Sequence, residues 1–304
     1  MIQDIKPHKL YNQYDPEKRP QEGSRVFAFR NSPENKRDIQ LLVKIRDEGK
    51  TLDIPKRSDF AVGLCDDDLI YLFSVDDESF FLLDKKEISG AEEVEEGGDY
   101  SFVSFMELRN SGLEPKEYVY AAFTAYQLAE WYSVTRYCGR CGAENENDKA
   151  ERARVCPKCG NRIYPRINPA VIIGVTDKET DSIVLTKYRR GYGHNALVAG
   201  FTEIGETLEE TVAREVMEEV GLKVENIRYY KSQPWGIASD ILVGFYCDVV
   251  GDKSIRMDEG ELKYAEWVGR EDIILQPLEY SLTNEMMMTF KINGYPGTHP
   301  TPAH

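Results

Sequence analysis

Three glutamates whose spacing places them on one side of a helix are the residues of this chain best placed to do chemistry. The run from Thr207 to about Val220 is rich in Glu, Ala, Val, Leu and Met and contains no Gly or Pro, which favours an α-helix. Within it, Glu215, Glu218 and Glu219 stand at positions i, i+3 and i+4, so their carboxylates project from one face. A hard divalent cation with oxygen ligands relieves their mutual repulsion. The spacing therefore predicts a metal site for Mg²⁺ or Mn²⁺.

A second pair of charged residues flanks this acidic face. We expect Glu206 and Arg214 to be a supporting pair, in which the arginine orients the acidic face and neutralises it from its edge. Val212, Val216 and Val220 fall on a different stripe of the same helix. The alternative is a solvated acidic face without a ligand, which is the usual interpretation of a charged stripe on an amphipathic helix.

The whole segment from Gly200 to Leu222 resembles the Nudix box of the Nudix hydrolases. This resemblance implies an α/β (α+β) fold, a Nudix α/β/α sandwich with a mixed sheet. It also implies hydrolysis of a nucleoside diphosphate linked to another group, with Glu206, Arg214 and the three helix glutamates as the catalytic residues. The matching positions are Gly200, Glu206, Arg214, Glu215, Val216, Glu218, Glu219, Gly221 and Leu222.

Length and composition limit the classes of partner. With 304 residues the chain is long enough for two compact domains and a small module. Its net charge of -15 argues against broad binding to nucleic acids or anionic membranes, because those surfaces require positive counter-charge. No apolar run approaches the roughly 20 residues that cross a bilayer, and the first residues lack the apolar stretch of a signal peptide. We therefore expect a cytoplasmic protein with no membrane partner.

Four of the six cysteines form two C-x2-C pairs. Cys138 and Cys141 are separated by fourteen residues from Cys156 and Cys159, a spacing typical of a zinc ribbon in which each pair gives two thiolates to one tetrahedral ion. Four ligands leave no open position, so this zinc is expected to be structural. The alternatives are two redox pairs and a ribbon that binds nucleic acid. Residues 133–165 carry only a mild basic excess, without interleaved exposed aromatics for base stacking.

The remaining sequence predicts the elements that position these groups. A helix is expected from Glu117 to about Val134. The acidic run 92–99 is expected to be a solvated loop, and Cys65 and Cys247 are expected to be small buried hydrophobes. Apolar runs bounded by turn residues predict strands at 26–29, 39–43, 60–64, 69–75, 80–83 and 100–105, and beyond Pro165 at 170–175, 182–186, 229–232, 241–249 and 264–268.

These features divide the chain into four segments. The first, 1–134, is expected to be an N-terminal Nudix-like α/β domain that ends in the linker helix. The second, 135–165, is the zinc ribbon, and the third, 166–292, is the catalytic Nudix domain. The last, 293–304, is rich in Gly and Pro and is expected to be a flexible tail.

Three features together resemble one subfamily, the NADH pyrophosphatases, over essentially the whole chain. They are the large N-terminal region, the ribbon directly before the catalytic domain, and the Ser-Gln-Pro-Trp sequence at 232–235. This resemblance implies a homodimer that cleaves the pyrophosphate of a dinucleotide substrate, NADH or NAD⁺, into AMP and nicotinamide mononucleotide. Mg²⁺ or Mn²⁺ would be the catalytic ion and Zn²⁺ the structural one.

The same resemblance assigns roles to individual residues. The catalytic ion would be bound by the backbone carbonyl of Ala199 and by carboxylates. The substrate base would stack between Phe201 and Tyr164, with Tyr164 reaching across a dimer from the ribbon. The expected carboxylate ligands are Glu215, Glu218, Glu219 and Glu261.

The loop after Trp235 departs from the subfamily. The subfamily usually continues with Pro-Phe-Pro, one variable residue and Ser, whereas this chain reads Gly236-Ile237-Ala238-Ser239-Asp240. A more flexible loop with less stacking surface leaves hydrolysis intact and alters the preference among dinucleotides. The complete set of expected substrate-binding residues is Tyr164, Phe201, Gln233, Pro234, Trp235, Gly236, Ile237, Ala238, Ser239 and Asp240.

Two other functions compete with this interpretation. One is a Nudix hydrolase of another linked nucleotide, such as NAD-capped RNA, ADP-ribose or other nucleoside diphosphates; the altered loop favours it, and the acidic charge disfavours long RNA. The other is a non-catalytic nucleotide-sensing regulator whose ribbon binds DNA. The complete set of box glutamates argues against the regulator, since such proteins generally lose them.

Overall fold

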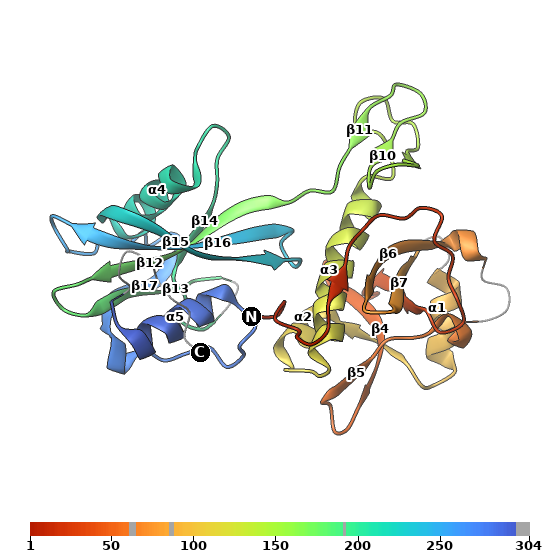
Figure 1. Ribbon diagram of the computed structural model, residues 1–304, viewed down its shortest axis with the longest axis horizontal. Coiled ribbons are helices and arrows are strands. Elements are labelled where there is room, and N and C mark those ends of the chain that lie inside the picture. The colour runs from red at the N-terminus through yellow and green to blue at the C-terminus, as the bar shows by residue number, and fades with distance from the viewer. Residues whose placement is uncertain (61–64, 85–87, 191–192, 296–304) are drawn as a thin grey trace. The chain divides into compact units, whose positions relative to one another are not determined.

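The chain divides into two compact units, which are described separately (Figure 1). The computed structural model describes residues 1–60, 65–84, 88–190 and 193–295. The C-terminal unit contains residues 1–2, 167–235 and the chain from Ser239 onward, and the N-terminal unit contains residues 3–166 and 236–238. None of the helices in these described ranges is long and apolar enough to cross a membrane.

A six-stranded mixed sheet is the centre of the C-terminal unit. Strands β12 and β16 pair in parallel, and the other neighbours pair antiparallel. One edge of β12 is shared, because β14 pairs with its first half and β13 with its last two residues. The strand order is β15 (Lys223–Trp235), β16 (Asp240–Val250), β12 (Asn168–Asp177), β13 (Ser182–Tyr188) and β17 (Leu262–Gly269), with β14 (Val198–Phe201) beside β12. All five strands predicted beyond Pro165 are confirmed.

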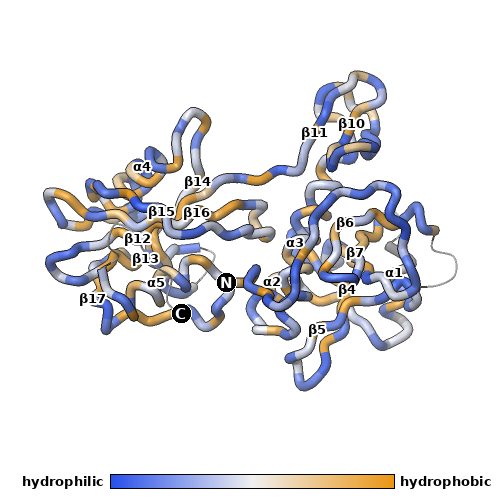
Figure 2. Tube along the Cα trace, viewed as in Figure 1, coloured by the Kyte–Doolittle hydropathy of each residue, from blue (hydrophilic) through white to orange (hydrophobic). Residues whose placement is uncertain are grey.

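Two helices cover opposite faces of this sheet. Ala170 and Ile172 of β12 pack in one cluster with α5, whereas Val171 and Ile173 pack in the other cluster with α4. This alternation is the period of two that a strand buried on both faces requires, and Figure 2 shows the hydrophobic central strands. The expected α/β/α sandwich with a mixed sheet is confirmed (Figure 1). The helices are α4 (Leu208–Val220) and α5 (Leu282–Asn293), and a short 3-10 turn lies at Arg270–Asp272.

Local sequence determines both ends of α4. The Thr207 side chain accepts a hydrogen bond from Glu210 N at 3.2 Å, and the Glu210 carboxylate accepts one from Thr207 N at 2.8 Å, which is a capping box. Gly221 ends the helix with φ +69° in the left-handed region, where glycine is favoured. The predicted apolar stripe is buried against the sheet: Val212, Val216 and Val220.

The N-terminal unit contains two small sheets, helices and the ribbon. The helix predicted from 117 to 134 is confirmed as α3. One sheet has the order β1 (Leu10–Tyr11), β6 (Leu69–Val75), β7 (Glu78–Leu83) and β2 (Arg25–Phe27); the other contains β3 (Phe29–Asn31), β4 (Ile39–Arg46), β5 (Thr51–Asp53) and β8 (Ser101–Ser104). The helices are α1 (Ile88–Glu96), α2 (Phe105–Asn110) and α3 (Lys116–Val134), with 3-10 turns at Arg57–Asp59 and Asp66–Asp68.

Two expectations for this unit are wrong. The acidic run is not a loop, because most of it lies in α1, where Ala91 and Val94 are buried in the core of the unit. Two apolar residues three apart share one face of a helix and can dock it even where glutamates surround them. Cys65 is exposed rather than buried, because it precedes an acidic 3-10 turn at the surface, whereas Cys247 is buried as expected. Of the strand predicted at 60–64, residues 61–64 lie outside the described residues.

The zinc ribbon belongs to the N-terminal unit and extends from the end of α3 (Figure 1). Tyr14 Oη donates to the carbonyl of Asp148 at 2.7 Å, and the Arg152 guanidinium donates to the carbonyl of Asn12 at 3.2 Å. The ribbon is therefore a subdivision of this unit rather than a third compact unit. Its strands are β9 (Glu146–Asn147), β10 (Arg154–Val155) and β11 (Arg162–Ile163).

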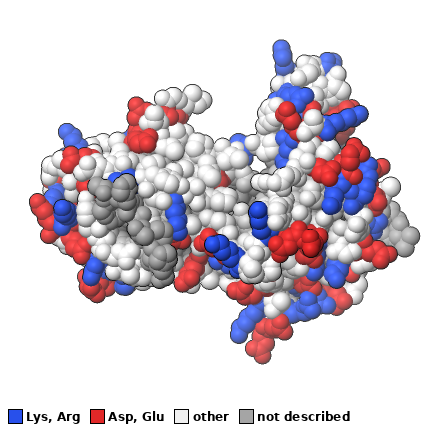
Figure 3. All heavy atoms as spheres, in the orientation of Figure 1, with Lys and Arg blue, Asp and Glu red and all other residues white. Residues whose placement is uncertain are grey.

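The described start of the C-terminal tail is held in place. Helix α5 extends to Asn293, and Tyr295 Oη donates to the Asp248 carboxylate at 2.6 Å. The rest of the predicted flexible tail, 296–304, lies outside the described residues. On the face drawn in Figure 3, basic and acidic side chains of the described residues are interspersed.

Candidate active site and zinc centre

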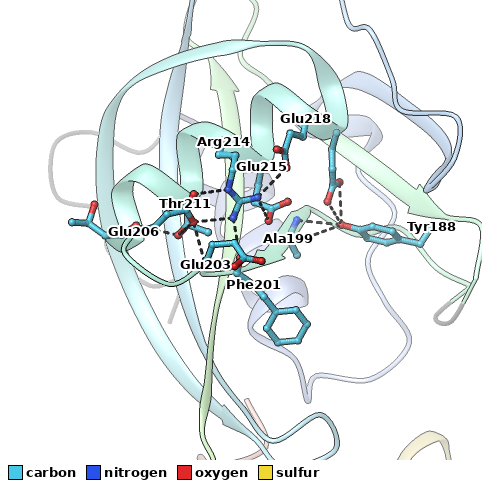
Figure 4. Close-up of polar contacts among 11 residues, drawn as sticks. Tyr188, Ala199, Phe201, Glu203, Glu206, Thr211, Arg214, Glu215 and Glu218 are labelled. Atoms are coloured by element: carbon cyan, nitrogen blue, oxygen red, sulfur yellow. Dashed lines mark hydrogen bonds and ion pairs between the residues drawn. The ribbon is translucent and has the colours of Figure 1, made fainter.

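Arg214 connects the charged residues of the acidic helix face (Figure 4). Its Nε and Nη2 donate to the two carboxylate oxygens of Glu206 at 2.6 and 2.9 Å. Its Nη1 donates to Glu215 at 2.7 Å and to Glu218 at 2.9 Å, while Nη2 also donates to the carbonyl of Phe201 at 2.9 Å. The predicted supporting pair of Glu206 and Arg214 is thus present, and all three guanidinium nitrogens are engaged.

Glu206 anchors the turn that leads into α4. Arg214 lowers the pKa of Glu206 to about 2, with further help from the Glu203 backbone N–H. One Glu206 oxygen also accepts from Glu203 N at 3.1 Å and from Thr211 Oγ1 at 3.0 Å. These donors use both carboxylate oxygens of Glu206. Glu206 therefore positions Arg214 and the loop rather than serving as a metal ligand.

Glu219 is the most buried carboxylate on the acidic face. Its residue is 3% exposed, whereas the Glu218 side chain is 59% exposed. Burial, together with the charges of Glu215 and Glu261, raises the pKa of Glu219 to about 8. Burial also raises the pKa of Glu215. Two carboxylates whose charged forms are destabilised in this way are suited to a bound cation, which would compensate both charges.

Tyr188 contacts the buried end of this cluster and was not predicted from the sequence. Its Oη lies 3.0 and 3.1 Å from the two Glu219 carboxylate oxygens, to which it donates. The same oxygen accepts from Ala199 N at 3.2 Å, as Figure 4 shows. Tyr188 ends a strand far from the box, and no spacing rule connects it to Glu219.

Gly200 is required by the close approach of β14 to α4. A Cβ built at this position would lie 2.0 Å from Glu215 Cδ, which is far inside van der Waals contact. The glycine at the start of the box therefore allows the Glu215 carboxylate to lie directly against the strand that carries Ala199. This is a packing reason for glycine here, independent of any backbone angle.

Glu261 reaches the same region from the turn before β17. Its carbonyl accepts from Arg189 N at 2.9 Å, which ties the turn to the chain just after Tyr188. The Glu261 charge raises the pKa of both Glu215 and Glu219. The structure thus brings the later glutamate close enough to interact electrostatically with the helix carboxylates.

The donor set fits Mg²⁺ or Mn²⁺. Carboxylates and a backbone carbonyl are the hard oxygen ligands that these ions take. In the present geometry Nη1 of Arg214 lies between Glu215 and Glu218, so a cation bound by both would replace hydrogen bonds of the arginine. The residues that would hold the ion are Glu215, Glu218, Glu219, Glu261 and Ala199.

The two aromatic residues expected to hold the substrate base both have accessible rings. Phe201 is 53% exposed and Tyr164 is 54% exposed. The Phe201 ring points away from the carboxylates (Figure 4), and Tyr164 Oη donates to Glu151 at 2.7 Å. They belong to different units of the chain.

The expected substrate loop is only partly available to a ligand. Gln233 is fully buried, with its amide nitrogen donating to the carbonyl of Tyr280 at 2.7 Å and its amide oxygen accepting from Leu282 N at 2.6 Å. Both of its polar groups therefore bond to the chain at the start of α5, and a contact of Gln233 with substrate stays a prediction. Trp235 packs partly against the core beneath α5, and Asp240 is buried. Pro234 and Ala238 are exposed, Ile237 and Ser239 are half-buried, and Gly236 is buried.

The four predicted zinc ligands converge. Their Sγ atoms all lie within 4.8 Å of one another, and they are the only group of potential ligands this close in the described ranges. The Sγ atom of Cys138 lies 3.7 Å from that of Cys159, and the Sγ atom of Cys141 lies 3.5 Å from that of Cys156. Tetrahedral thiolates about 2.3 Å from zinc are spaced about 3.8 Å apart. These contacts join one C-x2-C pair to the other, and all four Sγ atoms converge at one point, which favours a zinc site over two separate redox pairs.

Each cysteine pair forms the same turn. Gly142 donates to the carbonyl of Cys138 at 2.8 Å, and Gly160 donates to that of Cys156 at 2.9 Å. Both glycines have left-handed φ values, +74° and +70°, that side chains rarely adopt. A backbone hydrogen bond from Arg140 lowers the pKa of Cys138 to about 6, which favours the thiolate that binds metal.

Similarity to known proteins covers the ribbon and the C-terminal unit. Residues 166–289 match the family described as NUDIX domain, and residues 134–164 match the NADH pyrophosphatase zinc ribbon domain.

Curated relatives share the name NAD-capped RNA hydrolase NudC. That of Klebsiella pneumoniae (strain 342) is 42% identical over 152 residues, which is 50% of this chain and 58% of the relative. That of Escherichia coli O9:H4 (strain HS) is 44% identical over 153 residues with the same coverage. The chain therefore spans little more than half the length of these relatives. A solved NUDIX hydrolase from Nitrosomonas europaea is 21% identical with a TM-score of 0.47, covering 55% of this chain and 96% of that one.

Proposed function

We propose that this chain hydrolyses the pyrophosphate bond of NADH or NAD⁺ to AMP and nicotinamide mononucleotide. Its match to the NADH pyrophosphatase zinc ribbon domain is followed along the chain by its match to the NUDIX domain. The observation that carries the proposal is the pair of helix carboxylates set against the backbone of β14: Glu219 is buried and Glu215 is half-buried, and burial destabilises the charged form of each. A site of this kind suits a divalent cation, which would be bound by the carboxylates and by the phosphates of a substrate.

In this proposal each group of site residues has a different role. Glu215, Glu218, Glu219, Glu261 and the Ala199 carbonyl would hold Mg²⁺ or Mn²⁺. When bound, the cation would neutralise phosphate oxygens and acidify a water molecule. Arg214 and Glu206 keep the helix carboxylates in one orientation. The four cysteines hold a structural zinc that shapes the ribbon.

Substrate recognition is assigned to exposed aromatic rings. Phe201 ends β14 two residues after Ala199. A base stacked on the Phe201 ring would therefore lie close to the Ala199 carbonyl, which is an expected ligand of the cation. In a homodimer, Tyr164 would supply the second ring from the partner's ribbon. The exposed part of the loop, Pro234 and Ala238, would adjust the preference among dinucleotides. The cytoplasmic location stays a prediction.

A product-resolved assay tests the proposal. The zinc-loaded protein is incubated with Mg²⁺ or Mn²⁺ and with NADH, NAD⁺, ADP-ribose or diadenosine polyphosphates at matched concentrations. We expect NADH or NAD⁺ to give AMP and the mononucleotide with the highest kcat/KM. If none of these dinucleotides is cleaved, the proposal is wrong. If ADP-ribose or a diadenosine polyphosphate is clearly preferred, the reaction is correct but the loop at 236–240 has redirected the specificity.

A second candidate substrate is NAD-capped RNA, which the name shared by the curated relatives supports. The net charge of -15 disfavours long contacts with an RNA backbone. The two substrates are distinguished by the salt dependence of kcat/KM. If the protein contacts RNA phosphates, kcat/KM for capped RNA falls steeply as the salt concentration rises. If the site binds only the cap, kcat/KM depends on salt in the same way for capped RNA and for free NAD⁺.

A further inference from the structure

We propose that Tyr188 is a positioning residue that holds Glu219 and Ala199 in the arrangement that binds the catalytic cation. This inference rests on the proposed function, because it concerns the same metal-binding groups. It adds a residue that lies outside the box and that acts through Glu219 and Ala199.

The hydroxyl of Tyr188 connects two different elements of the site. It donates to the Glu219 carboxylate on α4, with oxygens at 3.0 and 3.1 Å, and accepts from the Ala199 backbone on β14 at 3.2 Å. The Ala199 carbonyl lies 3.4 Å from the same hydroxyl. A single side chain from β13 therefore sets the separation between a carboxylate and a backbone residue that belong to different elements.

The local geometry of β13 explains why this residue can reach the cluster. The pairing of β13 with β17 changes register between Lys187 and Tyr188, and such irregularities re-aim a side chain. The next residue, Arg189, donates its backbone N–H to the Glu261 carbonyl at 2.9 Å. The end of β13 thus contacts all three segments that carry predicted ligands: β14, α4 and the turn before β17.

The role of the Tyr188 hydroxyl can be tested separately from that of its ring. The ring packs partly buried against the cluster beneath α4, and phenylalanine would preserve this packing. Groups that orient metal ligands through hydrogen bonds typically change metal affinity or activity 10- to 100-fold when they are removed. If Tyr188 acts only by packing, Tyr188→Phe changes neither quantity.

The test compares Tyr188→Phe with Tyr230→Phe, a control variant that loses a tyrosine hydroxyl elsewhere in the C-terminal unit. Tyr230 Oη lies 3.0 Å from Glu285 and 3.0 Å from Thr289 on the α5 side of the sheet, so Tyr230→Phe also removes a buried hydroxyl bonded to a glutamate. Mn²⁺ affinity of the zinc-loaded full chain is measured by electron paramagnetic resonance without substrate. Values of kcat and KM for NADH are then measured, and thermal melting confirms that each variant is folded.

We expect Tyr188→Phe to weaken Mn²⁺ binding about tenfold and to lower kcat with little change in KM, while Tyr230→Phe has the Mn²⁺ affinity of the wild type. Wild-type Mn²⁺ affinity in a folded Tyr188→Phe protein would overturn the inference. If the wild type cleaves no dinucleotide and Tyr188→Phe still weakens Mn²⁺ binding, the proposed function fails and the positioning role stands.

Discussion

At the scale of single residues, the site depends on close contacts between α4 and β14 that leave no room for additional atoms. The clearest example is Gly200, where a Cβ would lie 2.0 Å from the Glu215 carboxylate carbon. An alanine at this position would displace either the strand or a predicted metal ligand. Since a misplacement of about 1 Å can cost about 100-fold in rate, Gly200 matters for chemistry as well as for packing.

Gly200→Ala is therefore expected to lower kcat about 100-fold or more while the protein remains folded. The measurement is steady-state turnover of NADH, with circular dichroism to confirm folding. Gly193→Ala is the matched control, because a Cβ there meets no atom within 4 Å. Equal rates for the two variants would show that Glu215 need not lie against β14.

The sequence predicted the carboxylates of the site but not all of their partners. Helical periodicity was sufficient for Glu215, Glu218 and Glu219, because spacing along a helix determines which side chains share a face. It could not identify Tyr188, since that contact depends on a register shift between two strands. For Gln233, motif similarity could not show that the side chain is buried at the start of α5, and its expected contact with substrate stays a prediction.

At the scale of elements, α4 must begin at a fixed residue for its carboxylates to face β14. The capping box between Thr207 and Glu210 fixes that start. Removing an N-cap side chain typically costs about 1 kcal/mol. Thr207→Ala should lower the free energy of unfolding of the C-terminal unit by about this amount, measured by urea denaturation. No change in the denaturation midpoint would indicate that packing alone determines the start of the helix.

Asp248 of β16 is hydrogen-bonded to β15 and makes a pH-dependent contribution to the stability of the fold. Burial alone would raise the pKa of Asp248, but hydrogen bonds from Arg228, Tyr295 and Asn226 outweigh it and lower this pKa. A lowered pKa in the folded state means that the contribution is complete above the unfolded value near 3.9 and is lost as pH falls through the folded value.

Asp248→Asn should therefore destabilise the protein at pH 7 by about 1–3 kcal/mol, as expected for breaking a partly buried network. The difference from the wild type should shrink below about pH 4, where the wild-type carboxyl also becomes protonated. Thermal melting between pH 3 and pH 7 measures both quantities. A difference that stays constant across this range would exclude the carboxylate as its source.

Element predictions succeeded where periodicity and turn residues agreed. The strands beyond Pro165 combine buried apolar runs with clear turns, and all of them are present. Helix α1 was missed because it docks against the core through tertiary contacts of Ala91 and Val94, which cannot be predicted from a run of glutamates. Helix α5 was not assigned, although Ser281 caps it and Leu282, Met286 and Phe290 are buried at helical spacing.

At the scale of the whole molecule, the six cysteines should have three different reactivities. Cys65 is exposed, Cys247 is buried with a raised pKa, and the other four converge at the predicted zinc centre. A thiol reagent should modify one cysteine quickly in the native zinc-loaded protein and four more after a chelator is added. Fast modification of more than one thiol while zinc is bound would contradict the closed four-cysteine site.

The proposed homodimer predicts complementation between inactive variants. Phe201 and Tyr164 lie in different units, and the proposal places them in one site from two subunits. Mixing Phe201→Ala with Tyr164→Ala protein should regenerate about a quarter of the wild-type activity, because half of the random dimers are mixed and one of their two sites is intact. Activity that stays at the level of the separate variants would place both rings in the same subunit or outside the site.

The central claim is that the carboxylates of α4, with Glu219 buried among them, support cleavage of a dinucleotide pyrophosphate. It is tested most directly by following AMP release from NADH, with Mg²⁺ or Mn²⁺, by the wild type, Glu219→Gln and Glu209→Gln. Glu209 is the control, because it is exposed in the first turn of the same helix. We predict that Glu219→Gln loses most turnover while keeping its fold and zinc, and that Glu209→Gln resembles the wild type. A near-normal rate for Glu219→Gln would contradict the metal assignment.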